Sequence, residues 1–265
     1  MTKSKHIRFN KTTYNHTVSS ATQGAYISNH VHTQFEIMLF VSGDADYVVE
    51  NQRYELSPYS LIITKPTEYH FLYFKKATNA YERYWLQFDI DDFPKEIATK
   101  IISGSGVIQL DYNNRISKLF RIIEEYALIF SPEKYPEFFN GLFTEIIFIL
   151  SLEVENNDVV TIQEADETTA KILKYINEHI TEPLSVQKIA DALFISSSTL
   201  CHKFSEYMKT GVMKYVKKKK IYYAEKMLRQ GVKPTVTATL LGYGDYSSFY
   251  RAYKEVFGAP PKHRE

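Results

Sequence analysis

Three histidines and one glutamate have the types and spacing of a ligand site. His30, His32 and Glu36 lie close together, and His70 follows later in the stretch PTEYH. Alternation along an extended strand would place the first three side chains on one face. Two imidazoles, a carboxylate and a distant imidazole can bind Zn, Mn, Ni or Fe. The same groups can instead hydrogen-bond a sugar- or metabolite-sized molecule, or one another.

We interpret these four residues as contacts to a small polar ligand, and we assign no metal ion and no other cofactor. Metal binding by the same side chains and a purely structural, hydrogen-bonded role are the alternatives. Four further residues could line the same cavity, although core packing is the simpler explanation for each. They are Tyr26, Met38, Tyr47 and Trp85.

A second set of side chains has the pattern of a DNA-reading surface. Ser185 is a good N-cap for a short helix, in which the small Ala190 lets another helix cross closely. Ser196 can cap the next helix, in which Leu200 faces inward. A bracing helix followed by one that offers short polar side chains is the layout of a helix-turn-helix motif, here over about residues 185–208. The outward-facing residues are Ser198, Cys201, His202 and Ser205.

The same scheme returns over residues 235–257. Ala238 follows Ala190 by 48 residues, so the two bracing helices correspond. Gly242 and Gly244 permit the positive φ that the turn needs, and Asp245 can cap the second reading helix. The outward-facing residues of this helix are Tyr246, Ser247, Tyr250, Arg251 and Lys254.

Arg251 is the strongest single candidate for a base contact. Its guanidinium can donate two hydrogen bonds to the O6 and N7 atoms of guanine. The alternative is a surface ion pair with Glu255, four residues further on. We favour the base contact because Arg251 lies on the predicted reading face.

A helix over about residues 213–229 connects the two motifs and contains the run Lys217–Lys220. Four consecutive residues point all round a helix, so they cannot all serve one contact. We expect most of these lysines to be solvated and one or two to reach phosphates. The helix would hold the reading helices at a fixed separation, and about 34 Å would place both in successive major grooves on one face of B-DNA.

The charge of the chain is unevenly distributed. The net charge is +1, but residues 167–265 contain 17 Lys and Arg against 9 Asp and Glu, a net of +8, and the remainder carries −7. A basic third indicates contact with a polyanion, and unequal domain surfaces are the alternative. The single Cys201 excludes an intramolecular disulfide, and no stretch reaches membrane-spanning length. These features predict a cytoplasmic protein with no membrane partner.

The elements that must position these residues change in character along the chain. Up to about residue 93, short runs of β-branched and aromatic residues alternate with turn residues, which predicts a barrel or sandwich. Beyond Pro94 the apolar residues recur every three or four positions, which predicts helices. The helix that begins at Pro136 has a wide apolar face, from which we expect contact with a second copy of the chain; packing within its own domain is the alternative. The expected strands are 35–42, 46–50, 60–64, 70–74 and 84–90.

From Glu167 onward the chain resembles the AraC family of bacterial transcription factors. Three stretches carry the resemblance: YINEHITEPLSVQKIADALFISSSTLCHKF, KKIYYAEKML and GYGDYSSFYRAYKEVFGAPPKHR. The resemblance implies that both motifs read bases. The residues so implied are Ser198, Cys201 and His202 in the first motif, and Tyr246, Ser247, Tyr250 and Arg251 in the second.

Several positions depart from the pattern of that family. The glycine that usually follows the first reading helix would fall at Lys209, but the chain has Gly211, so we expect the helix to end later. Pro234 and Thr237 stand where apolar residues usually pack the second motif. Lys219 replaces an apolar residue of the connecting helix. We therefore expect the second motif to be less rigid and to dock on DNA less firmly than the first.

The front of the chain resembles the cupin fold. The pattern Gly24-x5-His30-x-His32-x3-Glu36-x6-Gly43 matches the first cupin motif, and His70 could supply a fourth ligand. The second cupin motif is degraded, because Pro66-Thr67-Glu68 lacks its glycine. AraC-type regulators have cupin-like sensor domains, so the two resemblances together imply a ligand-sensing role for this half.

The N-terminal arm is basic. We expect it to be a disordered tail. The alternative, implied by the family resemblance, is a ligand-dependent latch. Its basic residues are Lys3, Lys5, Arg8 and Lys11.

These features predict an α+β multidomain protein, with an N-terminal cupin-like β-barrel and a helical pair, followed by an all-α domain with two helix-turn-helix motifs. The predicted parts are a ligand-sensing and dimerisation domain at 1–153, with its helical pair at about 112–152, a linker at 154–166 and a DNA-binding domain at 167–265.

The predicted function is that of a sequence-specific transcriptional regulator, not an enzyme. A sugar or related metabolite is the expected effector, and the expected partners are double-stranded DNA, that effector, a second copy of the chain and RNA polymerase. Whether transcription rises or falls is left open. The alternative is a metal-dependent cupin enzyme, a dioxygenase or isomerase, with a helical appendage. It would explain the histidines but would leave the two motifs and the basic tail without a purpose.

Overall fold

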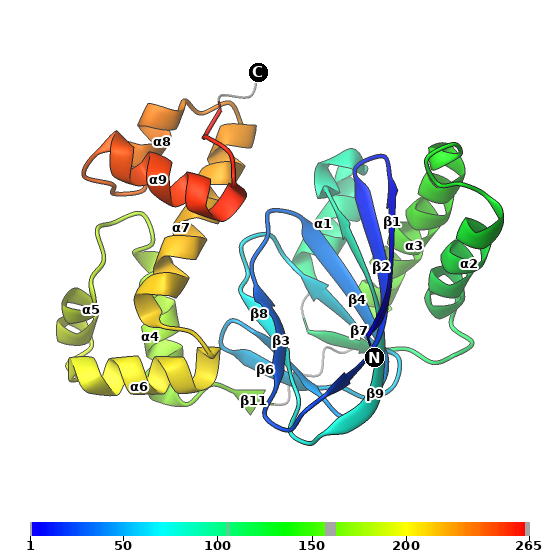
Figure 1. The fold of residues 1–265 in the computed structure, drawn as a ribbon, viewed down its shortest axis with the longest axis horizontal. Coiled ribbons are helices and arrows are strands. Elements are labelled where there is room, and N and C mark those ends of the chain that lie inside the picture. The colour runs from blue at the N-terminus through cyan, green and yellow to red at the C-terminus, as the bar shows by residue number, and fades with distance from the viewer. Residues whose placement is uncertain (1, 105, 157–162, 263–265) are drawn as a thin grey trace.

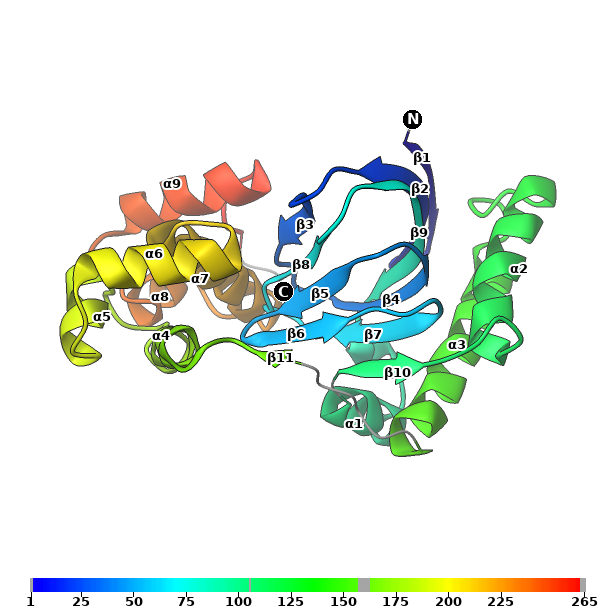
Figure 2. The ribbon, with the colours of Figure 1, turned by 90° about the horizontal axis from the view of Figure 1, so that it is seen from below.

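The computed structural model describes residues 2–104, 106–156 and 163–262, and it has a β-rich half followed by a helical half (Figure 1). The β-rich half carries helices on one side, and the helical half lies against the opposite side of the sheets (Figure 2). This arrangement confirms the predicted α+β fold class. Across the described residues, no helix is both long and apolar enough to cross a bilayer.

The strands form two antiparallel sheets that face each other. The six-stranded sheet has the order β1 (Lys3–Phe9), β2 (Thr12–Ala21), β9 (Thr78–Phe88), β4 (Phe35–Ser42), β7 (Ser60–Thr64) and β10 (Val107–Gln109). The five-stranded sheet has the order β11 (Gln163–Glu164), β6 (Gln52–Glu55), β5 (Asp46–Val49), β8 (His70–Tyr73) and β3 (Tyr26–His30). Along β4, Ile37 and Leu39 pack towards the helices, whereas Met38 and Phe40 pack into the barrel. Both faces of β4 are therefore buried.

The strongly apolar runs are strands, as predicted. β4 and β7 have the predicted bounds, whereas β9 begins at Thr78, six residues earlier than expected. Five further strands, most of them polar in composition, lie outside the predicted runs: β1, β2, β3, β6 and β10. β2 has the sequence TTYNHTVSSA, yet most of it is buried or half-buried because it lies between β1 and β9. Burial of this strand comes from its neighbours, which its own composition does not reveal.

The basic N-terminal arm is a strand, and the predicted disordered tail is wrong. β1 pairs with β2 along its whole length. Ile7 and Phe9 are buried in the core between the six-stranded sheet and the helices. Lys5 Nζ donates a hydrogen bond to the backbone carbonyl of Glu124, 3.1 Å away. The prediction followed the basic composition of the arm and overlooked the alternating apolar residues Ile7 and Phe9.

Three helices cover the outer face of the six-stranded sheet (Figure 2). They are α1 (Lys95–Ser103), which follows the 3-10 turn η1 (Ile90–Asp92), α2 (Arg115–Ile129) and α3 (Pro136–Asn156). The Asn114 side chain caps α2 by accepting a hydrogen bond from the Ile116 amide at 2.8 Å. α3 ends four residues beyond the predicted helical pair, inside the segment predicted as a linker. The other end of that segment contributes β11, which pairs with β6.

The helical half consists of two small motifs joined by one long helix (Figure 1). Its helices are α4 (Glu167–Glu178), α5 (Val186–Ala192), α6 (Ser197–Met208), α7 (Val212–Arg229), α8 (Pro234–Leu240) and α9 (Tyr246–Phe257). The predicted caps form: Ser185 caps α5, Ser196 caps α6 and Asp245 caps α9, each through its side-chain oxygen. The N-terminal half of α7 packs in the core of the first motif and the C-terminal half in that of the second.

The turns of the two motifs repeat the same backbone conformation with different residues. Phe194 has a φ of 55° in the first motif, and Gly242, 48 residues later, has a φ of 70°. The prediction of a positive φ at Gly244 is wrong, because Gly242 alone supplies that conformation in the second turn. A Cβ atom on Gly242 would lie 2.7 Å from the Thr181 carbonyl oxygen, so this position excludes larger residues. Phe194 instead projects into solvent. Glycine is therefore required in the second turn because that turn packs against the loop after α4.

The first reading helix ends earlier than predicted. α6 stops at Met208, and Lys209 adopts a left-handed C-cap with a φ of 53°. The equivalent C-cap of α9 is Gly258, 49 residues later, with a φ of 69°. The prediction that the helix would run on to Gly211 is wrong, because a lysine takes the conformation that glycine usually supplies.

Thr237 is a polar residue inside the second motif. It lies on α8, is fully buried, and within the described structure its hydroxyl has no hydrogen-bond partner. A buried hydroxyl without a partner costs about 1–3 kcal/mol. Thr169, which is equally buried on α4, donates a hydrogen bond to Asp166 at 2.6 Å. The two threonines are therefore equally buried, but only the hydroxyl of Thr169 forms a hydrogen bond.

Thr237→Val is expected to stabilise the second motif by about 1–2 kcal/mol, because it removes an unsatisfied hydroxyl without changing the volume of the side chain. Amide hydrogen exchange in α8 and α9 should slow by about five- to thirty-fold. Thr169→Val, which removes a satisfied hydroxyl, should instead accelerate exchange in α4. Equal effects of the two substitutions would contradict this account.

Candidate functional site

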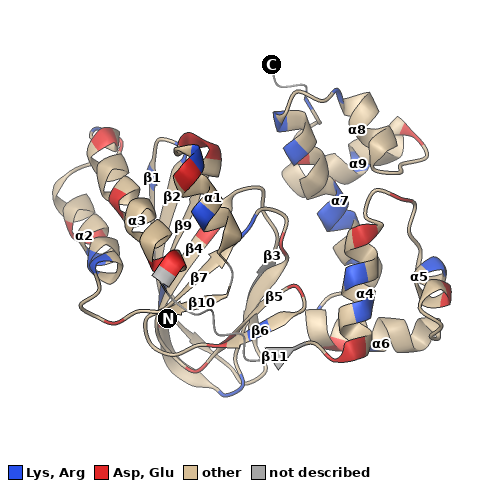
Figure 3. Cartoon of the chain, turned by 180° about the vertical axis from the view of Figure 1, so that it is seen from behind, with Lys and Arg blue, Asp and Glu red and all other residues tan. Residues whose placement is uncertain are grey.

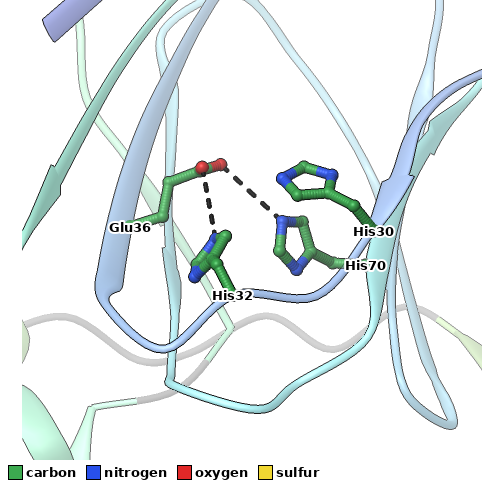
Figure 4. A group of neighbouring side chains, drawn as sticks. All are labelled: His30, His32, Glu36 and His70. Carbon is green, nitrogen blue, oxygen red and sulfur yellow. Dashed lines mark ion pairs between the residues drawn. The ribbon is translucent and has the colours of Figure 1, made fainter. Parts of the chain in front are cut away.

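The structure brings the four predicted ligand residues together between the two sheets (Figure 4). His30, the last residue of β3, lies opposite His70, the first residue of β8. Glu36 comes from β4 in the other sheet, and His32 comes from the loop between β3 and β4. Each residue offers one ligand atom, and these atoms all lie within 4.8 Å of one another.

The residues converge by a different route from the predicted one. The prediction placed the first three on alternating positions of a single strand, but β3 ends at His30 and the chain crosses to the other sheet before Phe35. The side chains meet because the two sheets face each other. Strand alternation still applies at His30 and His70, whose side chains point into the barrel (Figure 4).

Two of the histidines are held in one tautomer. Nδ1 of His32 lies 2.7 Å from the Gln34 carbonyl oxygen, and Nδ1 of His70 lies 2.9 Å from the Glu68 carbonyl oxygen. A carbonyl oxygen can only accept, so each Nδ1 carries the hydrogen and donates it. In the neutral imidazole the Nε2 atom then has a free lone pair. These Nε2 atoms lie 3.4 Å and 3.9 Å from the two carboxylate oxygens of Glu36.

The side chains of this cluster differ in charge, and burial is one cause of the difference. His70 is 1% exposed, and burial lowers the pKa of its imidazole well below the ordinary value, so the ring is neutral at pH 7. Burial alone would raise the pKa of Glu36, but its close contact with His32 and the neighbouring imidazoles outweigh this effect and hold that pKa below its ordinary value. The cluster therefore presents an ionised carboxylate next to at least one neutral imidazole.

A cavity of about 290 Å³ adjoins the cluster. Most of its lining is polar: Ser4, Asn15, Thr17, His30, Glu36, Tyr47, His70, Arg83, Trp85 and Gln87. Gln87 Nε2 donates a hydrogen bond to Glu36 at 2.9 Å and so fixes the carboxylate. The size is near the lower end for small-molecule sites, which admits a small polar ligand.

Two of the four other residues predicted to line the cavity do so, and two do not. Tyr47 and Trp85 line the cavity, whereas Met38 packs in the barrel core and Tyr26 is half exposed, away from the cavity lining. Arg83, which is 7% exposed, also lines the cavity and was not among the predicted residues. Alternation along β9 in register with Trp85 could have identified Arg83 and Gln87 as inward-facing.

The residues predicted to read DNA lie on the outer surfaces of α6 and α9. In both views these helices lie on the same side of the helical half, with α4 and α8 behind them (Figures 1 and 2). The backs of the helices are buried, at Leu200, Phe204, Met208, Phe249, Ala252 and Tyr253. The predicted contact residues are exposed, apart from the half-buried Tyr250: Ser198, Cys201, His202, Ser205, Tyr246, Ser247, Arg251 and Lys254.

Arg251 does not form the ion pair that was its alternative role. Nη2 of Arg251 donates a hydrogen bond to the Ser248 hydroxyl at 3.3 Å. Glu255 pairs instead with Lys217, at 2.5 Å. The Arg251 guanidinium therefore remains on the exposed face of α9, where it is accessible to a DNA duplex.

The prediction that most lysines of the run on α7 would be solvated is wrong. Lys219 and Lys220 are 3% and 7% exposed. Lys219 Nζ donates hydrogen bonds to Asn177 at 2.6 Å and to Glu50 of the barrel at 2.9 Å. Lys220 Nζ donates to the carbonyl oxygens of Glu182 at 2.6 Å and Leu241 at 2.7 Å. Because Glu182 follows α4 and Leu241 follows α8, Lys220 joins the two motifs.

The surface of the helical half is less uniformly basic than its composition suggests. On the ribbon of the helical half, the blue positions of Lys and Arg are interspersed with red positions of Asp and Glu (Figure 3). Lys219 and Arg229 pair with Glu50 and Asp89, two acidic residues outside this range. These pairs offset part of the formal +8 of residues 167–265.

Comparison with known proteins gives two family matches. An AraC-like ligand binding domain matches residues 15–132, and a helix-turn-helix domain matches residues 189–264. The uncharacterized HTH-type transcriptional regulator YbfI of Bacillus subtilis is 25% identical over 83% of this chain and 80% of its own length. A putative AraC-like transcription regulator of Streptomyces antibioticus is 30% identical over 37% of this chain and 32% of its own length.

Solved structures show weaker overall similarity. The crystal structure of ToxT from Vibrio cholerae is 17% identical, with a TM-score of 0.38, and the match covers 94% of this chain and 95% of that one. The DNA-binding domain of AdpA, solved in complex with a target DNA, is 16% identical, with a TM-score of 0.33, over 35% of this chain and 84% of that one.

Lys220→Met should destabilise the helical half by roughly 2–3 kcal/mol, because it leaves two buried carbonyl groups without their donor. The thermal unfolding transition followed by helical circular dichroism should shift to lower temperature. Lys214→Met is the matched control, since Lys214 is exposed on the same helix, and it should leave the transition unchanged. An unchanged transition in the Lys220 variant would show that these hydrogen bonds do not support the junction.

Proposed function

The chain belongs to the AraC-like family of transcription regulators, and from that membership we propose that it binds specific DNA sequences through α6 and α9 in response to a small molecule held in its barrel. A regulator of this kind acts on DNA, so we also propose a cytoplasmic location.

The observation that carries the DNA-binding proposal is the shared direction of the two reading helices (Figures 1 and 2). Each helix is capped at its N-terminus and buried along its back, so its exposed side chains are held in place. Lys220 and Gly242 tie the second motif to the loop after α4, which supports a fixed spacing of the two helices. Two helices fixed in this way can enter successive major grooves of one duplex.

For the effector, the cavity supports a small polar molecule. Its lining combines the buried guanidinium of Arg83 with the carboxylate of Glu36 and the amide of Gln87, which suits a ligand with both donors and acceptors. The comparisons do not support the expectation of a sugar in particular. The family membership favours a sensor over the cupin enzyme, and we propose no catalytic activity for the cavity.

A second copy of the chain is the proposed partner of α2 and α3. These helices and the loop between them expose large apolar side chains, whereas their other faces are buried against the six-stranded sheet. Leu128 and Ile129 are 78% and 70% exposed. The rings of Tyr126, Phe130, Tyr135 and Phe138 contact one another near this loop. Clustered exposed apolar groups are typical of an interaction surface. The exposed apolar residues of the proposed interface are Tyr126, Leu128, Ile129, Phe130, Tyr135, Phe138, Phe148 and Leu152.

Arg251→Ala is expected to weaken binding to the preferred DNA site by about 1–3 kcal/mol and to relax base preference at one or two positions. Arg251→Lys is the matched control, because it keeps the charge and loses the two-pronged donor. The lysine variant should retain salt-dependent binding to random DNA but show the same loss of base preference. Selection of binding sites from a random duplex library measures both effects, and unaltered preference in both variants would refute the assigned reading face.

Leu128→Glu is expected to convert a dimer to a monomer in sedimentation velocity experiments, because it places a charge in the proposed interface. The folded protomer should keep its stability, since Leu128 is exposed within it. Ile102→Glu on α1 is the control, as Ile102 is exposed outside the proposed interface. A wild-type chain that remains monomeric at high concentration would disprove the proposed interface.

A further inference from the structure

We propose that Phe194, the turn residue between α5 and α6, contacts the 5-methyl group of a thymine in the major groove that α6 enters. This inference rests on the proposed function and deepens it, because it adds an apolar base contact to the polar contacts assigned to the two reading helices. It makes part of the sequence preference of the protein depend on a methyl group rather than on hydrogen bonds.

The backbone of Phe194 adopts a conformation that is unfavourable for a residue with a side chain. Its φ is 55°, and bulky residues rarely occupy this left-handed region because the Cβ atom crowds the following carbonyl oxygen. The equivalent residue of the second motif, 48 positions later, is Gly242, which has a φ of 70° and no Cβ atom. A glycine at position 194 would therefore form the same turn at a lower free energy.

The hydrogen bonds of this turn do not involve the phenyl ring. The amide of Phe194 donates to the carbonyl oxygen of Asp191 at 3.2 Å, and the amide of Ile195 donates to that of Ala190 at 3.0 Å. The same two hydrogen bonds recur 48 residues later, where a glycine takes the place of the phenylalanine. The turn therefore has no need of an aromatic side chain at this position.

Packing within the chain does not compensate for this backbone conformation. The neighbours Leu193 and Ile195 pack against the core of the first motif, whereas Phe194 between them is 95% exposed. Among the large apolar residues of the described chain, none is more exposed. Single apolar side chains are common at protein surfaces, but this one combines almost full exposure with an unfavourable backbone. Such a combination indicates a role in binding, so the compensating contact lies outside the chain.

Phe194 lies beside the first turn of a reading helix. Ser196, two residues further on, is the N-cap of α6, and the first residues of a reading helix are those that contact base edges. Two residues span at most about 7 Å, so the ring is within reach of the same base pairs. The opposite end of α6 is the one next to the barrel, where Lys209 contacts Tyr73 (Figures 1 and 2). The barrel therefore leaves this turn accessible to a duplex.

The major groove offers one apolar group that suits a phenyl ring. Every base pair presents hydrogen-bond donors or acceptors there, and thymine alone adds a methyl group. A phenyl ring forms no ordinary hydrogen bond and gains nothing from the charge of a phosphate. Contact with a thymine methyl group instead removes apolar surface of both partners from water, which is favourable. The chemistry of the side chain thus selects thymine among the four bases.

An apolar contact would also supply what the polar side chains of α6 lack. The second motif carries Arg251, which can bind a guanine edge with two hydrogen bonds. The residues assigned to the reading face of the first motif carry only hydroxyl, thiol and imidazole groups, and Lys203 on the same helix pairs with Asp166 at 3.5 Å. Those reading residues are Ser198, Cys201, His202 and Ser205. A thymine contact from Phe194 gives the first motif a base preference of its own.

The first test removes the methyl group alone. The site preferred by the full-length protein is selected from random duplexes, and each of its thymines is then replaced in turn by deoxyuridine. One or two replacements, about ten base pairs from the positions affected by Arg251→Ala, should weaken binding about three- to fivefold, as expected for one buried methyl group. A half-site for α6 without thymine, or one in which no replacement weakens binding, would overturn the proposal.

The second test removes the ring. Phe194→Ala and Phe194→Gly should each bind the preferred site about five- to twentyfold more weakly and lose the response to deoxyuridine, because both lack the ring although their backbones differ in strain. Val236→Ala is the control, since it shortens an apolar side chain exposed on α8, and it should change neither quantity. Fluorescence anisotropy of labelled duplexes at one salt concentration measures these affinities. Wild-type affinity in both Phe194 variants would refute the contact.

Thermal unfolding separates a DNA contact from a structural role. Phe194→Gly should unfold at the same temperature as the wild type or a higher one, because glycine relieves the left-handed backbone. A lower unfolding temperature would show that the ring supports the fold and would overturn the proposal. Variants that bind DNA like the wild type but fail to regulate transcription would also overturn it, and would indicate a protein partner for Phe194. Failure of the proposed function itself is distinguishable, because the wild-type chain would then select no DNA site.

Discussion

The contact of Glu50 with Lys219 and Tyr215 determines how the two halves of the molecule meet. Glu50 has a left-handed backbone, with a φ of 52°, a conformation that costs about 1 kcal/mol or more for a residue with a side chain. It is compensated by hydrogen bonds to the backbone of Tyr69 and to two groups of α7. A buried lysine is stable only with partners, so Lys219 favours the docked arrangement in which Glu50 reaches it.

Helix α7 is therefore more than a spacer between two DNA-reading motifs. Successive residues of a helix are rotated by about 100°, so the lysine run points in several directions. Lys217 reaches α9, Lys219 reaches the barrel, and Lys220 reaches the loops after α4 and α8. The run links three parts of the protein, and the helix that sets the spacing of the reading helices is also the one that contacts the sensor.

The sequence was most informative where structure is local. Cap residues, turn glycine and apolar periodicity located both motifs, because each depends on residues a few positions apart. It was least informative where partners are distant. Nothing in the lysine run reveals Glu50 or Glu255, and nothing in the basic arm reveals that β2 pairs with it. The four residues of the cluster do lie together, but the predicted geometry was wrong, since they come from two sheets and a loop rather than from one strand.

The backbone connects the histidine cluster to the core of the DNA-binding half, because Val31 and Tyr69 pack in that core. His70 cannot move without Tyr69, and neither His30 nor His32 can move without Val31, because these residues are covalent neighbours on opposite faces of the same segments. Closely packed cores do not absorb such shifts gradually, so a displacement inside the barrel must be met by rearrangement of the core shared with α7. A polar ligand that pulled on the histidines would act through the same two residues.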